Sequence, residues 1–441
     1  MAFAGFDLLR AEMRAIGSVH SVGRVTQVRQ GTIDVSGLTR RAALGDRALI
    51  RCQSGREIGA EVLSLSRGGV TVLPDGAADG VAISDEVELL GQGGIAPHES
   101  WIGRIIDPFG VALDGRPLVH GAQERELRAA PPPAAQRKRL GARLETGMTA
   151  FNTLLPLVRG QRIGLFAGSG VGKSSLLANF ARGVQADVVV IALIGERGRE
   201  LREFVEKTLG PEGMARAVII AATSDQSPLV RRRCAWAAMS VAEYFRDQGK
   251  HVLYLADSVT RFAEAHREVA LAGGEPASLR GYPPSTSYQI MALGERAGPG
   301  IDGSGDITAV FSVLVAGSDM DEPVADILRG VLDGHVVLER EIAERGRFPA
   351  INLLRSVSRS LPDAASIEEN QLIARARALL GAYDRAEMMI QAGLYAAGSD
   401  SMVDAAIRIW AELDGFIALP GPEGVASSFA QLGGILAQVG R

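Results

Sequence analysis

A glycine-rich turn that closes on lysine and serine is the part of this chain most clearly suited to chemistry. The run A-G-S-G-V-G-K-S covers residues 167–174 and follows an apolar run, Ile163 to Ala167, that predicts a short buried strand. Glycines let the backbone fold around an anion with its N–H groups turned inward, and the start of the next helix adds positive dipole. The pattern predicts a phosphate-binding P-loop. Ala167 replaces the motif's first glycine, which should matter little because that position ends the strand.

The residues of this P-loop are expected to bind ATP. Lys173 would reach the β- and γ-phosphates, and Ser174 would be a ligand of Mg²⁺. The other residues of the predicted cradle are Gly168, Ser169, Gly170, Val171, Gly172 and Ser175.

Two further apolar runs end in carboxylates. V-L-Y-L-A-D ends at Asp257, where P-loop enzymes hold Mg²⁺ through its water shell, although an aspartate that only caps the next helix would look the same. V-V-V-I-A-L-I-G leads into Glu196 and Arg197. If this strand lies next to the P-loop strand, Glu196 is close to the γ-phosphate and can orient a water for in-line attack. A surface cluster of salt bridges is the alternative, because more arginines and a glutamate follow.

The elements that must position these residues alternate between helix and strand, which predicts a parallel sheet with crossover helices. The expected strands after the P-loop are Val188–Ile194, Ala217–Ala222, His251–Ala256 and Ile307–Val315. The expected helices between them include Arg199–Leu209 and Leu229–Gln248. Beyond Pro362 the strand signals stop, and the helices expected there are Glu368–Leu380, Arg385–Gly393 and Ser401–Leu413.

The first third of the chain has a different texture. Between Val19 and Leu90, short β-rich runs separated by Gly and Asp predict a small barrel or sandwich. Trp101 to Leu118 is expected to be a turn-rich connection, and Ala129 to Arg139 a stiff linker with a solvated basic run. A helix that docks on its own domain, or on a partner or membrane surface, is predicted at the N-terminus. Its apolar face consists of Phe3, Phe6, Leu9, Met13 and Ile16.

Composition narrows the class of protein. With 441 residues, 46% hydrophobic and 22% charged, the chain should form two or three globular domains. A formal net charge of −4 argues against a dedicated nucleic-acid binder. Cys52 and Cys234 show no metal-ligand spacing and are expected to be small buried hydrophobes. The sequence has no apolar run of roughly 18 residues and no signal-peptide pattern, so we expect a cytoplasmic protein.

Together the motifs resemble the F/V-type rotary ATPase superfamily, and within it most closely the flagellar and type III secretion export ATPases. In chain order they are A-G-S-G-V-G-K-S, G-E-R-G-R-E, Y-L-A-D-S-V-T-R-F-A-E-A, G-Y-P-P-S, E-R-A-G and S-V-S-R. The resemblance covers nearly the whole chain, since G-R-I-I-D-P-F-G, D-M-D-E-P-V-A-D and A-Y-D-R-A-E-M-M-I-Q-A-G-L-Y also match. It departs at Ser287–Leu293, which we expect to be a loop near the pore that is less basic than usual and lacks Leu-Pro.

The resemblance implies a β-barrel, an α/β RecA-like ATPase core with a parallel sheet, and a C-terminal α-helical domain, assembled as a hexameric ring. The expected bounds are a docking helix at 1–18, the barrel at 19–95, a connection and linker at 96–145, the ATPase domain at 146–362 and the helical domain at 363–441.

The resemblance also implies roles for single residues. Glu196 would be the catalytic carboxylate, with Arg197 beside it at the γ-phosphate. Arg359, in S-V-S-R, would be an arginine finger that reaches the neighbouring subunit's site, and Phe348, in R-F-P-A-I-N, would pack on adenine. Because one chain carries both Glu196 and Arg359, a homohexamer is the favoured assembly.

The activity implied is Mg²⁺-dependent ATP hydrolysis that energises protein export at a flagellum, with a virulence injectisome as the alternative. A catalytic subunit of an ion-driven ATP synthase, a Rho-type RNA translocase and a non-enzymatic ring scaffold are less favoured. Residues 19–90 lack the aromatic side chains that an RNA-binding barrel would need. The implied partners are a stator-like regulator at the N-terminal helix, export gate and stalk proteins, and export substrates with their chaperones, without nucleic acid. The implied location is peripheral at the inner-membrane export apparatus.

Overall fold

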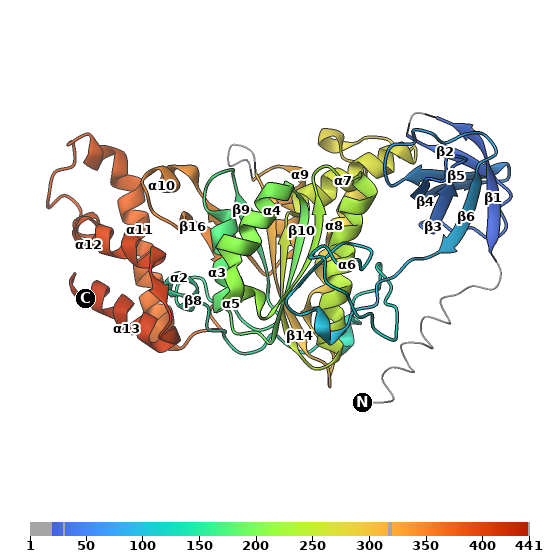
Figure 1. Cartoon of the computed structure of the whole chain (residues 1–441). Helices are drawn as coiled ribbons and strands as arrows, with labels where there is room; N and C mark the ends of the chain where they lie inside the picture. Colours follow the sequence, from blue (N-terminus) through green and yellow to red (C-terminus); the bar gives the residue numbers. More distant parts are fainter. Residues whose placement is uncertain (1–19, 30, 316–319, 440–441) are drawn as a thin grey trace.

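Three units follow one another along the chain: a small barrel, a central α/β unit and a group of C-terminal helices (Figure 1). The computed structural model describes residues 20–29, 31–315 and 320–439. The helix predicted at residues 1–18 lies outside these ranges. The predicted fold class is confirmed. Within the described ranges, no helix is long and apolar enough to cross a membrane.

The N-terminal unit is a closed barrel of six strands in the order β1-β2-β5-β4-β3-β6. Its inner and outer residues alternate because successive side chains of a strand point to opposite faces, as in β5, where every second residue is buried. The sequence predicted a barrel or sandwich here, and closure leaves no free sheet edge. The strands are β1 (Ser21–Val28), β2 (Ile33–Ser36), β3 (Arg47–Arg51), β4 (Glu57–Ser66), β5 (Gly69–Pro74) and β6 (Glu86–Gly91).

The central unit is built on a nine-stranded sheet in the order β16-β15-β9-β14-β12-β10-β11-β7, with β13 (Gly298–Pro299) paired to β14. Its strands from β15 to β7 are parallel, and β16 is antiparallel to β15. The bounds are β7 (Arg104–Ile106), β9 (Arg162–Ala167), β10 (Val188–Glu196), β11 (Ala217–Thr223), β12 (His251–Asp257), β14 (Asp306–Leu314), β15 (Gly334–Leu338) and β16 (Ile351–Ser358).

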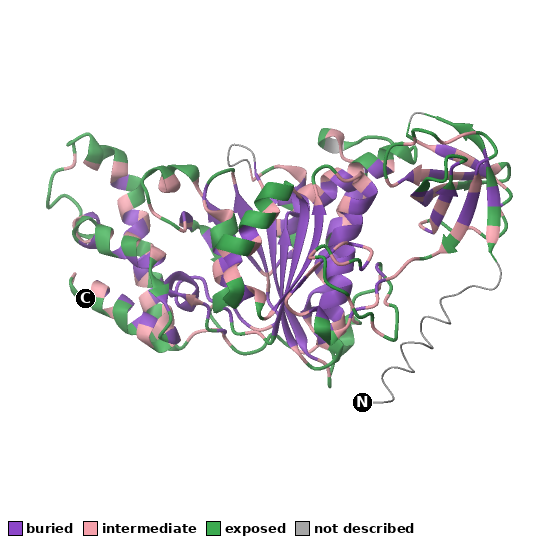
Figure 2. Ribbon diagram, in the orientation of Figure 1, coloured by how far each residue is buried: buried purple, intermediate pink, exposed green. Residues whose placement is uncertain are grey.

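Helices cover both faces of this sheet, so its middle strands are buried throughout (Figure 2). In β10, Val189 and Ile191 belong to the core that contains α3 (Lys173–Gly183). Val190 and Ala192 belong to the opposite core, which α6 (Pro228–Asp247) and α7 (Val259–Ala272) share. Burial on two faces explains why these strands are continuous apolar runs in the sequence.

Strand order bears on the role of Glu196. This role was argued for the case in which the Glu196 strand lies next to the P-loop strand, but β14 and β12 lie between β9 and β10. The carboxyl ends of these parallel strands nevertheless meet at one edge of the sheet: Leu314 pairs with Ala167, and Leu193 with Asp257. All the predicted chemistry at the ends of β9, β10 and β12 therefore shares that edge.

Two segments expected to be connections belong to the central unit. Trp101–Leu118 contributes β7, which extends the sheet beside β11 and is anchored by a buried bidentate pair, Arg104–Asp114. The basic run of the linker is not simply solvated either. Arg137 Nη1 lies 3.1 Å from Glu295 Oε2, and Lys138 Nζ lies 2.7 Å from Asp306 Oδ1. These pairs fasten the linker to the core.

Ser287–Leu293, expected to be a loop, lies within helix α8 (Ser285–Arg296). Ile290 and Leu293 are buried at helical spacing, whereas Tyr288 and Met291 are exposed. The apolar period of 3.6 residues, which indicates a helix, was therefore present in the sequence.

The helices predicted at Glu368–Leu380 and Arg385–Gly393 are one helix, α11 (Ile367–Gln391), which starts with a capping box formed by Ser366 and Glu369. Gly381 lies inside it. An interior glycine costs a helix about 1 kcal/mol, but Leu380 and Ala382 are buried against the core, and their packing outweighs that cost. Two more helices, α12 (Ser401–Ala418) and α13 (Gly424–Ala437), complete this unit.

The expected helix Arg199–Leu209 is α4 (Gly198–Glu203) followed by a π-helical turn, Phe204–Leu209. The two cysteines are free and buried, as predicted: Cys52 lies in the barrel core and Cys234 in the sheet-side core under α6.

Candidate functional site

The P-loop connects β9 to α3 at the carboxyl edge of the sheet. Gly170 and Gly172 have φ values of +78° and +86°, a region that glycine adopts without steric cost. Ala167 is a regular strand residue, because its carbonyl accepts a hydrogen bond from the N–H of Val315 at 3.0 Å. The loop lines a pocket of about 800 Å³ together with the ends of β10 and α7. As expected, the missing first glycine leaves the turn intact.

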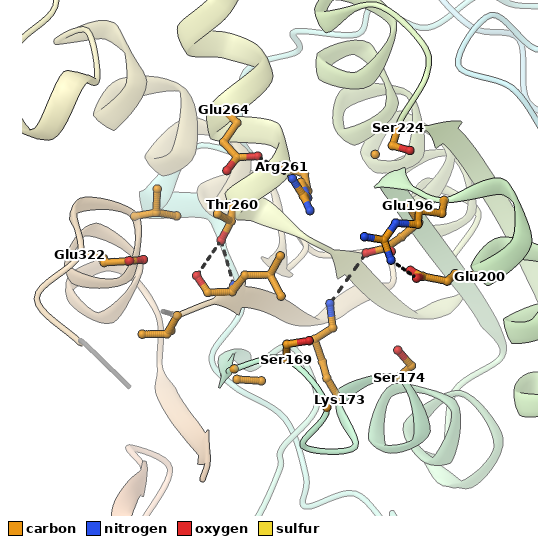
Figure 3. Close-up of a pocket in the computed structure, with 18 of the residues that line it drawn as sticks. Ser169, Lys173, Ser174, Glu196, Glu200, Ser224, Thr260, Arg261, Glu264 and Glu322 are labelled. Atoms are coloured by element: carbon orange, nitrogen blue, oxygen red, sulfur yellow. Dashed lines mark hydrogen bonds and ion pairs between the residues drawn. The ribbon is translucent and has the colours of Figure 1, made fainter. Parts of the chain in front are cut away.

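Lys173 lies between the carboxylates of Glu196 and Asp257. Figure 3 shows its approach to Glu196 in this pocket. Its Nζ contacts Oδ1 of Asp257 and lies 3.9 Å from Oε1 of Glu196. Asp257 is only 3% exposed, and its Oδ1 also accepts a hydrogen bond from the Ser312 hydroxyl at 2.8 Å. The long lysine side chain thus spans the two strands that separate β9 from β10, and it brings three predicted residues together.

Glu196 is the carboxylate with the most perturbed acidity in the pocket. Burial raises the pKa of Glu196 to about 7, and the negative charge of Asp257 adds to the rise, whereas Lys173 opposes it. A carboxylate whose pKa lies near neutral pH can both hold and accept a proton during a reaction.

The ion pairs expected by the alternative interpretation also form. Arg197 is 78% exposed on its side chain and pairs with Glu200 at 2.8 Å, and Arg202 pairs with Glu206 at 2.8 Å. Arg197 lines the pocket. The predicted cluster of salt bridges is therefore present next to Glu196, but Glu196 is not a partner in these two pairs.

The predicted Mg²⁺ ligands fit that ion. Both predicted ligands, Ser174 and Asp257, line a smaller cavity of about 190 Å³, which Glu196 also lines. Their hydroxyl and carboxylate oxygens are hard donors of the kind that Mg²⁺ selects, and Mg²⁺ is usually held by one or two carboxylates together with substrate phosphates. In the described ranges no three His, Cys, Asp or Glu side chains form a group that could hold a metal ion by themselves.

Phe348 lies beside the P-loop of its own chain. A Cβ placed on Gly172 would be 3.1 Å from Cδ1 of the Phe348 ring. The ring is 51% exposed, so one part contacts the loop while another is open to solvent or a ligand. This position is compatible with the predicted contact to a purine.

Arg359 lies at the opposite edge of the sheet from the P-loop. Ser358 pairs with Gly334 at the start of β15, whereas the other end of β15, Leu338, pairs with Ala167. Four residues of β15, from Gly334 to Leu338, therefore separate the level of Ser358 from the start of the P-loop, about 13 Å at the usual rise of a strand. The Arg359 guanidinium donates hydrogen bonds to the carbonyls of Leu332 (3.1 Å) and Arg329 (3.2 Å). The structure does not bring this arginine to the site that the other predicted residues share.

Similarity to known proteins agrees with this site. The model of the nucleotide-binding domain of the ATP synthase alpha/beta family matches residues 147–358. The flagellum-specific ATP synthase of Caulobacter vibrioides is 45% identical over 437 residues, which cover 97% of this chain and 98% of the relative. The chain belongs to the flagellum-specific ATP synthase family. The Salmonella typhimurium member is 41% identical over 422 residues, covering 93% of this chain and 92% of that protein.

This chain is also similar to an ATPase of a type III secretion system, EscN. The model of the C-terminal domain of the type III secretion ATPase EscN matches residues 365–419. The assembled ATPase EscN of enteropathogenic E. coli has a TM-score of 0.86 and 35% identity, over 94% of this chain and all of that one. A second structure contains EscN in complex with its central stalk EscO and has a TM-score of 0.84. The predicted family is confirmed, and the flagellar interpretation is supported over the injectisome one.

Several residues that line the pocket of about 800 Å³ were not predicted from the sequence. Thr260, Arg261 and Glu264, in the first turns of α7, face the P-loop from across the pocket (Figure 3). Glu322 lines the same pocket from the start of α9 (Pro323–Val331). Thr260, Arg261 and Glu264 belong to the run Y-L-A-D-S-V-T-R-F-A-E-A, and their helical spacing directly after Asp257 was the signal that could have identified them.

Proposed function

We propose that this member of the flagellum-specific ATP synthase family hydrolyses ATP with Mg²⁺ and couples hydrolysis to protein export at the flagellum. The observation that supports this most is that Lys173, beside the P-loop, meets the carboxylates of both Glu196 and Asp257. Cation, carboxylate and metal-binding carboxylate are the parts that in-line attack on a γ-phosphate requires.

In the proposed reaction, the P-loop N–H groups and Lys173 bind the β- and γ-phosphates. Ser174 and Asp257 would hold Mg²⁺, which would neutralise charge on the phosphates. Glu196 orients the attacking water and accepts its proton as the new oxygen–phosphorus bond forms, while the bond from the γ-phosphorus to the bridging oxygen breaks and ADP leaves. Its raised pKa suits this task, because a base is most effective when its pKa lies near the working pH.

We further propose that Arg359 serves the site of a neighbouring subunit in a homohexameric ring. Its distance from its own P-loop supports this, since a planar guanidinium can stabilise phosphate charge only when it reaches the phosphate. The assembled state of EscN supports a ring, and the EscN–EscO complex supports a stalk protein as a partner. A stator-like regulator at residues 1–18, an export gate, export substrates with chaperones and a peripheral position at the inner membrane complete the proposal by family resemblance.

The test replaces Lys173 by alanine in the purified protein. We expect MgATP hydrolysis to be lost, and omission of Mg²⁺ to abolish the wild-type rate. Lys207→Ala is the matched control, because Lys207 is 77% exposed on its side chain and pairs with Glu203 on the surface of the adjacent helix. Wild-type turnover by Lys173→Ala at saturating ATP would refute the proposed site.

A virulence injectisome is the second candidate, favoured by the EscN similarity. Lys173→Ala introduced at the chromosomal gene separates the two functions. Loss of flagellar filaments with intact secretion of virulence effectors supports the flagellar role, and the reverse pattern supports the injectisome.

A further inference from the structure

The short segment that carries Phe348 is tied to the C-terminal helices by the residue before it. Arg347 has a side chain that is only 10% exposed, and its Nε lies 3.0 Å from Oδ1 of Asp414. Asp414 belongs to α12, 67 positions farther along the chain. The ion pair therefore joins the edge of the nucleotide-binding unit to the helical unit.

The Arg347 guanidinium also shapes its own segment. Its Nη1 donates a hydrogen bond to the carbonyl of Pro349 at 3.1 Å, and its Nη2 donates one to the carbonyl of Ile351 at 2.7 Å. One planar group thus holds the backbone on the far side of Phe348 and is itself held by a carboxylate. A lysine could not make these contacts together, because its ammonium lacks the fork of an arginine.

Arg347 and Asp414 are both partly buried, so each charge is stabilised by the opposite charge of its partner. Burial lowers the pKa of Arg347 and raises the pKa of Asp414, so both charged forms are partly desolvated. A small cavity of about 120 Å³ lies beside the pair, bordered by the stacked rings of Tyr383 and Trp410. At this point of the interface, the ion pair beside a small cavity holds the Phe348 segment to α12.

We propose that the Arg347–Asp414 pair is a positioning contact that holds Phe348 against the P-loop, so that the placement of α12 sets the affinity for the purine end of the nucleotide. Neither residue touches the reacting phosphates, so both are positioning residues. This inference rests on the proposed function, in which Phe348 contacts the base.

A neighbouring ion pair provides a matched control. Arg345 Nη1 lies 3.1 Å from Glu387 Oε1 on α11 and so joins the same two units. No hydrogen bond from Arg345 to the Phe348 segment accompanies it among the described contacts. A general loosening of the interface should follow from loss of either pair, but displacement of Phe348 should follow only from loss of the Arg347 pair.

The experiment measures KM and kcat for MgATP, and the inhibition constant of inorganic tripolyphosphate, which lacks a purine. Asp414→Asn should raise KM for ATP about fivefold, in the range for loss of one ion pair. We expect kcat and the tripolyphosphate constant to stay within about twofold. Glu387→Gln should leave all three unchanged.

A double-mutant cycle decides whether the effect passes through Phe348. In a Phe348→Ala background, Asp414→Asn should cause no further rise in KM. An unchanged KM in the folded single variant, or an equal rise with and without Phe348, would overturn the inference. If Asp414→Asn fails to fold, Arg347→Lys replaces it, with the same pattern expected. Wild-type ATP hydrolysis that depends on Lys173 would leave the proposed function standing in either case.

Discussion

The contact between Gly172 and Phe348 allows a prediction in which two glycines of one loop serve as perturbation and control. Gly170 and Gly172 both have positive φ values, so alanine at either position adopts a left-handed conformation. A Cβ at Gly170 would meet nothing within 4 Å, whereas one at Gly172 would lie 3.1 Å from the Phe348 ring. Both alanine variants therefore pay the same backbone cost, but only Gly172→Ala also meets the Phe348 ring.

The magnitudes follow from these two observations. A left-handed conformation costs an L-residue about 1–2 kcal/mol, which corresponds to about 5- to 30-fold weaker nucleotide binding if the loop must keep this shape to bind. Gly172→Ala must also displace a half-exposed phenylalanine from its rotamer, which adds about 1 kcal/mol. We therefore expect Gly172→Ala to weaken ATP affinity about fivefold more than Gly170→Ala.

The assay is equilibrium binding of ATP to each variant, repeated in a Phe348→Ala background. The additional loss at Gly172 should disappear when the ring is absent, because only the shared backbone cost remains. Equal losses of ATP affinity for the two glycine variants in the presence of Phe348 would refute the contact between residue 172 and the ring. An additional loss at Gly172 that persists without Phe348 would show that the ring does not cause it.

Two other predictions concern charge. Glu196→Gln should still bind ATP but hydrolyse it about 10²-fold or more slowly, as expected for loss of a positioned catalytic group. In the wild type, kcat should fall as pH drops below about 7, because the raised pKa of Glu196 means that acid protonates the base, and kcat measured from pH 5.5 to 8.5 should show this limb only when Glu196 is present. Asp114→Asn should lower the free energy of unfolding by about 2 kcal/mol in urea titrations, since it leaves buried Arg104 with carbonyl partners alone. The Arg104 guanidinium holds the pKa of Asp114 well below its usual range, so this stabilisation is present above the unfolded pKa of about 3.9 and is lost as pH falls below it. An unfolding free energy that is equal for both proteins at pH 7 would contradict the role of this pair.

The parts of the site that could be predicted are those where a strand delivers a residue to the sheet edge. Lys173, Glu196 and Asp257 each follow an apolar run, and parallel strands bring their carboxyl ends together whatever their order. That order was not predictable from the runs themselves, so the sequence could not show that β14 and β12 lie between β9 and β10. Lys173 compensates for this separation, because its side chain is long enough to reach across β14 and β12 to Glu196.

The parts that could not be predicted depend on contacts between distant segments. Nothing in the local pattern of Arg104–Ile106 indicates that this short stretch would extend the sheet beside β11, since three residues carry too little periodicity. The Arg347–Asp414 pair likewise joins two ordinary charged residues whose partners emerge only when α12 packs on the core. Site residues at the ends of strands can be predicted from the sequence. The residues that hold them in place cannot, because their partners lie far away in the sequence.

The claim that each site is completed by a neighbouring subunit has one direct test. Arg359→Ala should bind ATP but hydrolyse it on the order of 10³-fold more slowly than the wild type, as expected for loss of an arginine finger. Lys173→Ala should be inactive. Mixed rings of the two contain interfaces that pair an intact P-loop with an intact Arg359, so their mixture should recover hydrolysis that neither shows alone. A mixture of Arg359→Ala with the double variant Lys173→Ala/Arg359→Ala is the control and should recover nothing. If well-mixed rings of the two single variants stay inactive, Arg359 does not act across the subunit boundary.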